Sequence, residues 1–228
     1  MHRAGTTLVD LLGILAMTAC ATFPSLPTHV SLRVMSYNIE AGGGNLDRTT
    51  DPGASASVPL REYGVALLSR YPIVAWANHT ITRLSTQTEG ARPAPMPGFL
   101  EATIDVRGTR IRVFNTHLDY RPDPEVRRQQ VAETLTIIGD PSVPMLLFGD
   151  LNAPPAAPEL QPLFKRLRDS WTLSADSGFT YPATVPVRRI DYVLTSRHFR
   201  VRTMSVHESQ ASDHRPVIVE LVVDQARK

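Results

Sequence analysis

The chain has 228 residues, of which 42% are hydrophobic and 20% are charged. This length allows one domain with a substantial buried core, and this composition is typical of a folded globular protein and excludes extensive disorder. The formal net charge of +2 does not by itself indicate a nucleic-acid partner, because duplex-binding proteins usually concentrate basic residues on one face.

The N-terminus is predicted to direct export. A short basic start precedes an apolar run from Leu8 to Ala19, which is too short to span a bilayer comfortably and indicates a signal peptide over residues 1–19. The only cysteine, Cys20, ends this run in a sequence that resembles the lipobox of bacterial lipoproteins. We therefore expect a protein of the bacterial cell envelope with a lipid anchor at Cys20 and a tether over residues 20–30. The alternatives are secretion after cleavage at an A-x-A pattern, and an uncleaved apolar arm.

Residues 31–228 are predicted to form a single domain, which begins with an apolar strand over residues 31–39. A loop is expected from Ala41 to Pro59, because ten of these nineteen residues are Gly, Pro, Ser or Thr. Short apolar runs predict strands at 63–68 and 73–76. Alternating residues on both sides of Arg107-Gly108 predict a β-hairpin of strands 99–106 and 109–117.

Two helices are predicted in the second half of the chain. The first covers residues 125–138, with Val131, Leu135 and Ile138 at helical spacing, and the second covers residues 159–168. Further strands are expected at 145–148, 190–194, 201–206 and 217–222. The pattern predicts a strand-rich α/β domain in which most neighbouring strands are antiparallel.

Polar and ionisable residues follow several of these strands, where a loop can present them on a rigid base. Five segments share this arrangement: Tyr37-Asn38-Ile39-Glu40, Asn115-Thr116-His117-Leu118-Asp119, Phe148-Gly149-Asp150-Leu151-Asn152-Ala153, Arg189-Ile190-Asp191-Tyr192-Val193 and Ser212-Asp213-His214-Arg215-Pro216.

These segments resemble, in the same order, the motifs of the endonuclease/exonuclease/phosphatase superfamily, and the resemblance runs from Arg33 to Leu221. It implies an α/β (α+β) fold: a four-layer α-β-β-α sandwich of two mostly antiparallel sheets. It also implies a site with one or two Mg²⁺ or Mn²⁺ ions, at which water attacks a phosphate ester. A hard cation would stabilise the negative charge that gathers on the phosphoryl oxygens.

The resemblance also assigns roles to individual residues. His214 matches a catalytic histidine that contacts the scissile phosphate or helps to activate water. Asp191 would accept a hydrogen bond from the other ring nitrogen of His214 and fix its tautomer. Asp213 matches a carboxylate on the metal side of the site, and Arg215 is interpreted as structural or exposed at the rim.

Four more residues complete the expected site. Asp150 would orient the attacking water, Asn152 would bind the phosphate or leaving group, His117 would donate to the phosphate, and Asn38 would contact metal or water. The structural alternatives are an Asx-type turn for Asp150 and Asn152 and a satisfied structural histidine for His117.

One segment of the family pattern is missing. Typical members place a helix, a strand ending in Gln-Glu and another helix after the first strand, and that glutamate is the principal metal ligand. Here Tyr63 follows Asn38 after only 25 positions, which is too few for such a unit. We expect an exposed sheet edge, and we expect Glu40 to hold a single, weaker ion together with Asp213 and Asn38. Alternatively, Glu40 merely begins a solvated loop.

The sequence therefore predicts a metal-dependent phosphoric ester hydrolase without an obligate protein partner. Its substrate could be a lipid, a small phosphodiester or a nucleic acid, and the predicted anchor and weak net charge favour the first two. The missing glutamate favours an alternative, a catalytically impaired binding protein anchored at the surface. A third interpretation is a gene that lost a segment and encodes a poorly folding product.

Overall fold

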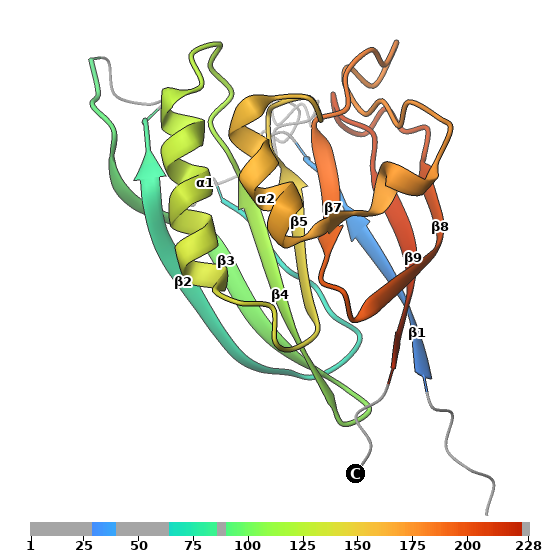
Figure 1. The fold of residues 1–228 in the computed structure, drawn as a ribbon. Helices are drawn as coiled ribbons and strands as arrows, with labels where there is room; N and C mark the ends of the chain where they lie inside the picture. The colour runs from blue at the N-terminus through green and yellow to red at the C-terminus, as the bar shows by residue number, and fades with distance from the viewer. Residues whose placement is uncertain (1–28, 40–63, 86–89, 225–228) are drawn as a thin grey trace, which may run out of the picture.

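The computed structural model describes residues 29–39, 64–85 and 90–224, which build two packed β-sheets with helices on one outer face (Figure 1). No helix in these ranges is both long and apolar enough to cross a membrane. The strands are β1 (His29–Ser36), β2 (Ile73–Arg83), β3 (Ala94–Val106), β4 (Thr109–His117), β5 (Met145–Asp150), β6 (Arg168–Asp169), β7 (Asp191–Thr195), β8 (Phe199–Val206) and β9 (Val217–Asp224). The helices are α1 (Glu125–Ile138), α2 (Gln161–Arg166) and the short 3₁₀ turns η3 (Pro158–Leu160) and η4 (Ser170–Leu173).

The strands form a three-stranded sheet in the order β1-β9-β8 and a six-stranded sheet in the order β2-β3-β4-β5-β7-β6. Every neighbouring pair is antiparallel except β4 and β5, which are parallel. Parallel neighbours need a crossover connection, and α1 supplies it. The mostly antiparallel sandwich expected from the sequence is thereby confirmed.

The β3–β4 hairpin turns at Arg107 and Gly108, whose φ angles are 53° and 87°. Positive φ at both central residues of a two-residue turn matches the right-handed twist of the flanking strands. The Gly108 amide donates to the Asp105 carboxylate at 2.7 Å. The antiparallel register then continues as far as the pair Phe99 and Thr116, so this turn sets the register of β4, whose last residue is His117.

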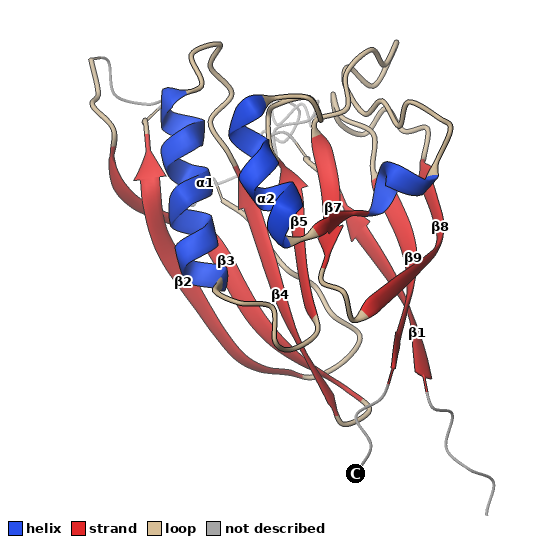
Figure 2. Ribbon diagram, in the orientation of Figure 1, coloured by secondary structure: helices blue, strands red, loops and turns tan. Residues whose placement is uncertain are grey.

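Two apolar cores lie on opposite faces of the six-stranded sheet. Along β5, which is buried throughout, Leu147 belongs to the core beneath the helices, whereas Leu146 and Phe148 belong to the core between the sheets. This alternation follows from the period of two along a strand. Figure 2 shows α1 and α2 side by side on the outer face of the six-stranded sheet. The three-stranded sheet packs on the inner face.

The structure agrees with the predicted helix at residues 125–138 and with the predicted hairpin, although β2 continues to Arg83 and β3 begins at Ala94, beyond the predicted bounds. Three larger differences from the sequence analysis remain. The segment over residues 64–68 is not a strand, because it pairs with no strand in the described ranges. The helix predicted over residues 159–168 is split into η3 and α2 and ends early, because Leu167 is extended and Arg168 pairs with Thr195. Neither α-helix in the described ranges covers the outer face of the three-stranded sheet.

A buried ion pair fastens α1 to η3. The guanidinium of Arg127 donates to Glu159 at 2.9 and 3.1 Å, and both side chains are at least nine-tenths buried. The same guanidinium also donates to the backbone carbonyls of Asp119 and Arg121. Arg127 therefore holds the loop that follows β4, next to His117.

We predict that Arg127→Met lowers the free energy of unfolding by about 3–5 kcal/mol, because it leaves the Glu159 carboxylate buried without a partner. The double variant Arg127→Met/Glu159→Leu should recover most of this loss, since it removes both charges. Thermal or denaturant unfolding of the three proteins measures the effect. Equal stability of the single variant and the unmodified chain would contradict the prediction.

Candidate active site

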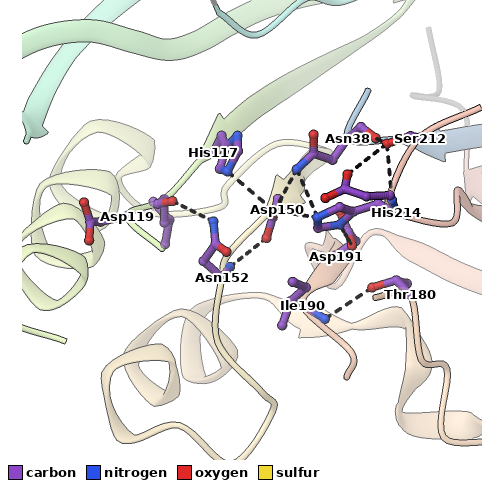
Figure 3. Close-up of polar contacts among 12 residues, drawn as sticks. Asn38, His117, Asp119, Asp150, Asn152, Thr180, Ile190, Asp191, Ser212 and His214 are labelled. Carbon is purple, nitrogen blue, oxygen red and sulfur yellow. Dashed lines mark hydrogen bonds and ion pairs between the residues drawn. The ribbon is translucent and has the colours of Figure 1, made fainter. Parts of the chain in front are cut away.

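Three of the predicted site residues lie in one row across the six-stranded sheet. His117 is the last residue of β4, Asp150 is the last of β5, and Asp191 is the first of β7. The strand register pairs His117 with Asp150 and Asp150 with Asp191. Residues opposite each other on neighbouring strands project from the same face, so the three side chains meet at one edge of the sheet (Figure 3).

The second sheet and its loops contribute Asn38 and His214. Asn38 follows β1, and His214 lies in the loop between β8 and β9. The Asn38 amide donates to Asp150 Oδ2 at 2.9 Å, and its nitrogen lies 3.4 Å from His214 Nε2. The hydroxyl of Ser212 donates to the Asn38 carbonyl at 2.6 Å and accepts from the His214 amide at 3.2 Å. The site thus spans the ends of both sheets.

His214 is held against Asp191. Its Nδ1 lies 2.8 Å from Asp191 Oδ2, and its Nε2 lies 3.7 Å from Asp150 Oδ2. The ring of Tyr181 packs beside the imidazole, with 4.8 Å between the ring centroids. Burial disfavours the imidazolium, but the hydrogen bond to Asp191 and the nearby carboxylate charges outweigh burial and raise the pKa of His214. The pair has the arrangement that the family resemblance implies.

The surroundings of Asp150 disfavour the ionised form of its carboxyl group. Burial, followed by the charge of neighbouring Asp191, raises the pKa of Asp150 to about 7. The charge of His214 and hydrogen bonds from the Asn152 amide, at 2.8 Å, and from Asn38 offset only part of this effect. In addition, Asp191 Oδ1 is buried and accepts no hydrogen bond from the described part of the chain. Two close carboxylates with an unpartnered oxygen form a site that favours a cation.

The turn after β5 explains the pattern Gly149-Asp150-Leu151-Asn152. Gly149 has a φ of 137°, and a Cβ atom there would lie 1.9 Å from the carbonyl oxygen of Thr116. Asn152 has a φ of 52°, a conformation that Asn tolerates better than most residues. Its side-chain amide donates to the Leu118 carbonyl at 2.9 Å. The turn therefore packs tightly on the end of β4 and sets the position of Asp150.

The pKa of His117 is shifted in the opposite direction from that of His214. Burial and the neighbouring guanidinium of Arg83 lower the pKa of His117 to about 4. Its Nε2 lies 3.5 Å from Asp150 Oδ2, and Arg83 donates to the His117 carbonyl at 3.1 Å. The sequence analysis did not identify Arg83, Tyr181 or Ser212 as part of the site. Ser212 stands within a quoted motif, but no sequence signal marks the other two.

The described residues that could bind a metal ion together are Asp150, Asp191 and His214, whose ligand atoms lie within 4.8 Å of one another. Asp213 is not in this group, and its Oδ1 lies 3.3 Å from the Ser212 hydroxyl oxygen. Glu40, the other predicted carboxylate ligand, lies outside the described residues. Arg215 donates to the Ala183 carbonyl at 2.7 Å, a contact consistent with a structural role.

Comparison with protein families gives a match over most of the chain. The model of the endonuclease/exonuclease/phosphatase family matches residues 18–214. Comparison with curated proteins gives no match.

Solved structures share the fold at low sequence identity. A functionally unknown conserved protein from Enterococcus faecalis has a TM-score of 0.56 and 21% identity, over 67% of each chain. A mannosyl-6-phosphatase from Bacteroides thetaiotaomicron has a TM-score of 0.53 and 19% identity, over 66% of this chain and 67% of its own. The human Nocturnin catalytic domain with bound sulfate has a TM-score of 0.51 and 21% identity, over 67% and 60%. This chain therefore spans about two thirds of each of these structures.

We predict that Asp150→Asn stabilises the metal-free protein increasingly as the pH rises from about 5 to about 8. Because the folded pKa of Asp150 is about 7, above its ordinary value of 3.8, its contribution to stability is present at low pH and is lost as the pH rises through that range. The lowered pKa of His117 acts in the opposite direction. For this reason the measured quantity is the difference in melting temperature between variant and unmodified chain, in the presence of a chelator.

Added Mg²⁺ should raise the melting temperature of the unmodified chain at about pH 8 and should have little effect on Asp150→Asn, because bound ligands stabilise the folded state. Asp140→Asn is the matched control, since the Asp140 side chain is 95% exposed. A difference between Asp150→Asn and the unmodified chain that does not change with pH would contradict the prediction.

Proposed function

Because this chain belongs to the endonuclease/exonuclease/phosphatase family, we propose that it hydrolyses phosphate esters with the help of a divalent metal ion. The row of His117, Asp150 and Asp191 at one sheet edge, with Asn38 and His214 joined to it from the other sheet, is the observation that carries the proposal. Proton acceptors, hydrogen-bond donors and carboxylate oxygens converge there, which is what the attack of water on a phosphate ester requires.

His214 and Asp191 act as a pair in this proposal. Asp191 occupies the Nδ1 side of the imidazole, so Nε2 is the nitrogen that faces the reacting groups. The carboxylate fixes the tautomer and orientation of the ring and favours its protonated form. His214 can therefore present an N–H group to a phosphoryl oxygen or exchange a proton there. Tyr181 packs against the ring and limits its rotation.

Asp150 is proposed to orient the attacking water and to accept its proton. Its Oδ1 receives the Asn152 amide and its Oδ2 receives Asn38, so the carboxylate is held in one orientation. His117, neutral because of its lowered pKa, can donate one hydrogen bond to a phosphoryl oxygen. Asn152 uses an amide hydrogen for Leu118 and has a second one, with which it can bind the phosphate or the leaving group.

The donor set suits a hard divalent cation, for which Mg²⁺ and Mn²⁺ are the candidates. Asp150, the unpartnered Oδ1 of Asp191 and the amide of Asn38 would hold it, and Glu40 and Asp213 remain predicted ligands. When bound, such a cation lowers the pKa of water and stabilises the charge that develops on phosphoryl oxygens.

The proposed substrate class is a phosphate ester. The fold neighbours include a mannosyl-6-phosphatase, which is consistent with this chemistry. Among lipids, small phosphodiesters and nucleic acids, we favour the first two, because the net charge of the chain is only +2. We further propose that the protein is exported and anchored through Cys20, or secreted. Residues 1–28, which carry these signals, lie outside the described ranges.

We predict that His214→Ala lowers kcat/KM for bis-p-nitrophenyl phosphate by roughly 10²–10⁴-fold, the range typical of a lost general acid or base. Asp191→Asn should lower it by roughly 10–100-fold, because the histidine keeps its ring but loses its orienting carboxylate. The assay is run with Mg²⁺ and with Mn²⁺, and a chelator should abolish turnover in both cases.

His198→Ala is the matched control, because His198 lies just after β7, at the end of that strand opposite Asp191. A kcat/KM of His214→Ala equal to that of the unmodified chain would refute the proposal. Metal-induced stabilisation without any turnover in the unmodified chain would favour the alternative, an anchored binding protein that kept the scaffold. Loss of metal-dependent turnover in Glu40→Ala would support the predicted role of Glu40.

A further inference from the structure

A cavity of about 690 Å³ opens beside β1, and none of the five converging site residues lines it. One wall is the stretch of β1 from Ser31 to Met35, and the opposite wall is the stretch from Leu67 to Tyr71. Strands of the six-stranded sheet form its base. We call this cavity the β1 slot; its base residues are Ile104, Val106, Ile111, Val113, Leu146 and Phe148.

The first wall of the slot is a free strand edge. β1 lies at one end of the order β1-β9-β8 and pairs with β9 along its whole length. On its other side, β1 pairs with no strand among the described residues. Such an edge presents a row of backbone N–H and C=O groups that can bind another strand.

The second wall is an extended segment that is not part of either sheet. From residue 64 to residue 71 the side chains alternate between exposed and half-buried, as they do along a strand. The Asn115 side chain donates to the Ala66 carbonyl at 2.8 Å, and the Asp105 amide donates to the Pro72 carbonyl at 2.9 Å. These contacts fasten the segment across the inner face of the six-stranded sheet, and Leu67 and Tyr71 pack into the core between the sheets.

The base of the slot is apolar, and most of the charged residues in its lining are basic. All six base residues belong to the core between the sheets. The charged residues that line the slot are Arg33, Arg70, Arg202 and Glu220, and Arg33 is paired with Glu220 at 2.6 Å. The lining therefore carries a net positive charge. A partner for this slot would need apolar groups for the base, backbone groups for the free edge of β1 and acidic groups for the basic residues of the lining.

We propose that the β1 slot is a docking site for one extended strand of another polypeptide, in which apolar residues alternate with acidic ones. The strand would pair with the free edge of β1, place its apolar side chains on the base and turn its acidic side chains towards Arg70. Main-chain hydrogen bonds give affinity in this mode of recognition, and the alternating side chains give specificity. At about 3.3 Å per residue, an eight-residue partner would match the length of β1.

Three other occupants would fit the space and the hydrogen-bonding groups of the slot less well. β1 of a second copy carries β9 along its other edge, and this β9 would need the space that Leu67 to Tyr71 occupy. Residues 40–63 of the chain itself are rich in Gly, Pro, Ser and Thr and have no run of large apolar residues. A fatty chain would contact the base but would leave the backbone groups of β1 without partners.

The test uses the full chain and two labelled octapeptides, acetyl-EVEVEVEV-amide and acetyl-VKVKVKVK-amide, with fluorescence anisotropy as the readout. The acidic peptide should bind, and it should slow hydrogen exchange of the residue 31–35 amides that point away from β9 by at least about tenfold. Arg70→Glu should weaken binding of the acidic peptide roughly fivefold to tenfold and strengthen binding of the basic peptide, because one attractive contact becomes repulsive. Arg128→Glu, on the exposed surface of α1, should change neither affinity.

Three results would overturn the proposal. In the first, a scrambled peptide of the same composition, EEEEVVVV, binds as tightly as the alternating one. In the second, dodecanoate displaces the peptide and itself binds without protecting the β1 amides, which would assign the slot to a fatty chain. In the third, the outward amides of β1 are already protected without peptide, which would mean that the chain covers its own edge.

Discussion

The rest of the site depends on two carboxylates that the fold holds side by side in a buried place. Asp150 and Asp191 are opposite each other on β5 and β7, and both are almost fully buried. In such surroundings, two neighbouring negative charges repel each other much more strongly than in water. The structure offsets this repulsion with hydrogen bonds from Asn38 and the Asn152 amide and with the imidazole of His214. A divalent cation bound between the two carboxylates would remove the remaining repulsion, because its charge equals the sum of theirs.

The backbone enforces this costly arrangement. The parallel register of β4 and β5 and the antiparallel register of β5 and β7 place three polar residues in one row. Gly149 allows β5 to approach Thr116 closely, and the left-handed Asn152 turns the chain back over β4. On the other side, Arg127 clamps the loop after β4. The favourable free energy of apolar packing elsewhere in the domain compensates for this local strain.

Features that depend on neighbouring residues could be predicted from the sequence, whereas features that depend on contacts between distant residues could not. Periodicity placed α1 and the β3–β4 hairpin correctly, because local propensity and the core agree in these elements. The strand predicted over residues 63–68 was wrong over the described residues 64–68, although burial alternates there, because a strand also needs a partner and periodicity does not reveal one. Motifs at strand ends indicated which residues would converge. They could not indicate that Asp150 and Asp191, and not Asp213, share one cluster with His214, nor that Arg83 lies beside His117. Those facts depend on register and on long-range packing.

β1 connects the β1 slot with the candidate active site. Its outward edge forms a wall of the β1 slot, and two residues after its end Asn38 binds Asp150 and lies beside His214. The Ser212 hydroxyl contacts both the Asn38 carbonyl and the His214 amide. The position of β1 therefore affects the positions of both Asn38 and His214. An edge strand paired on one side only is held less firmly than a central strand. A polypeptide that paired with its free edge would therefore act on the strand that leads to Asn38, which binds one of the two buried carboxylates.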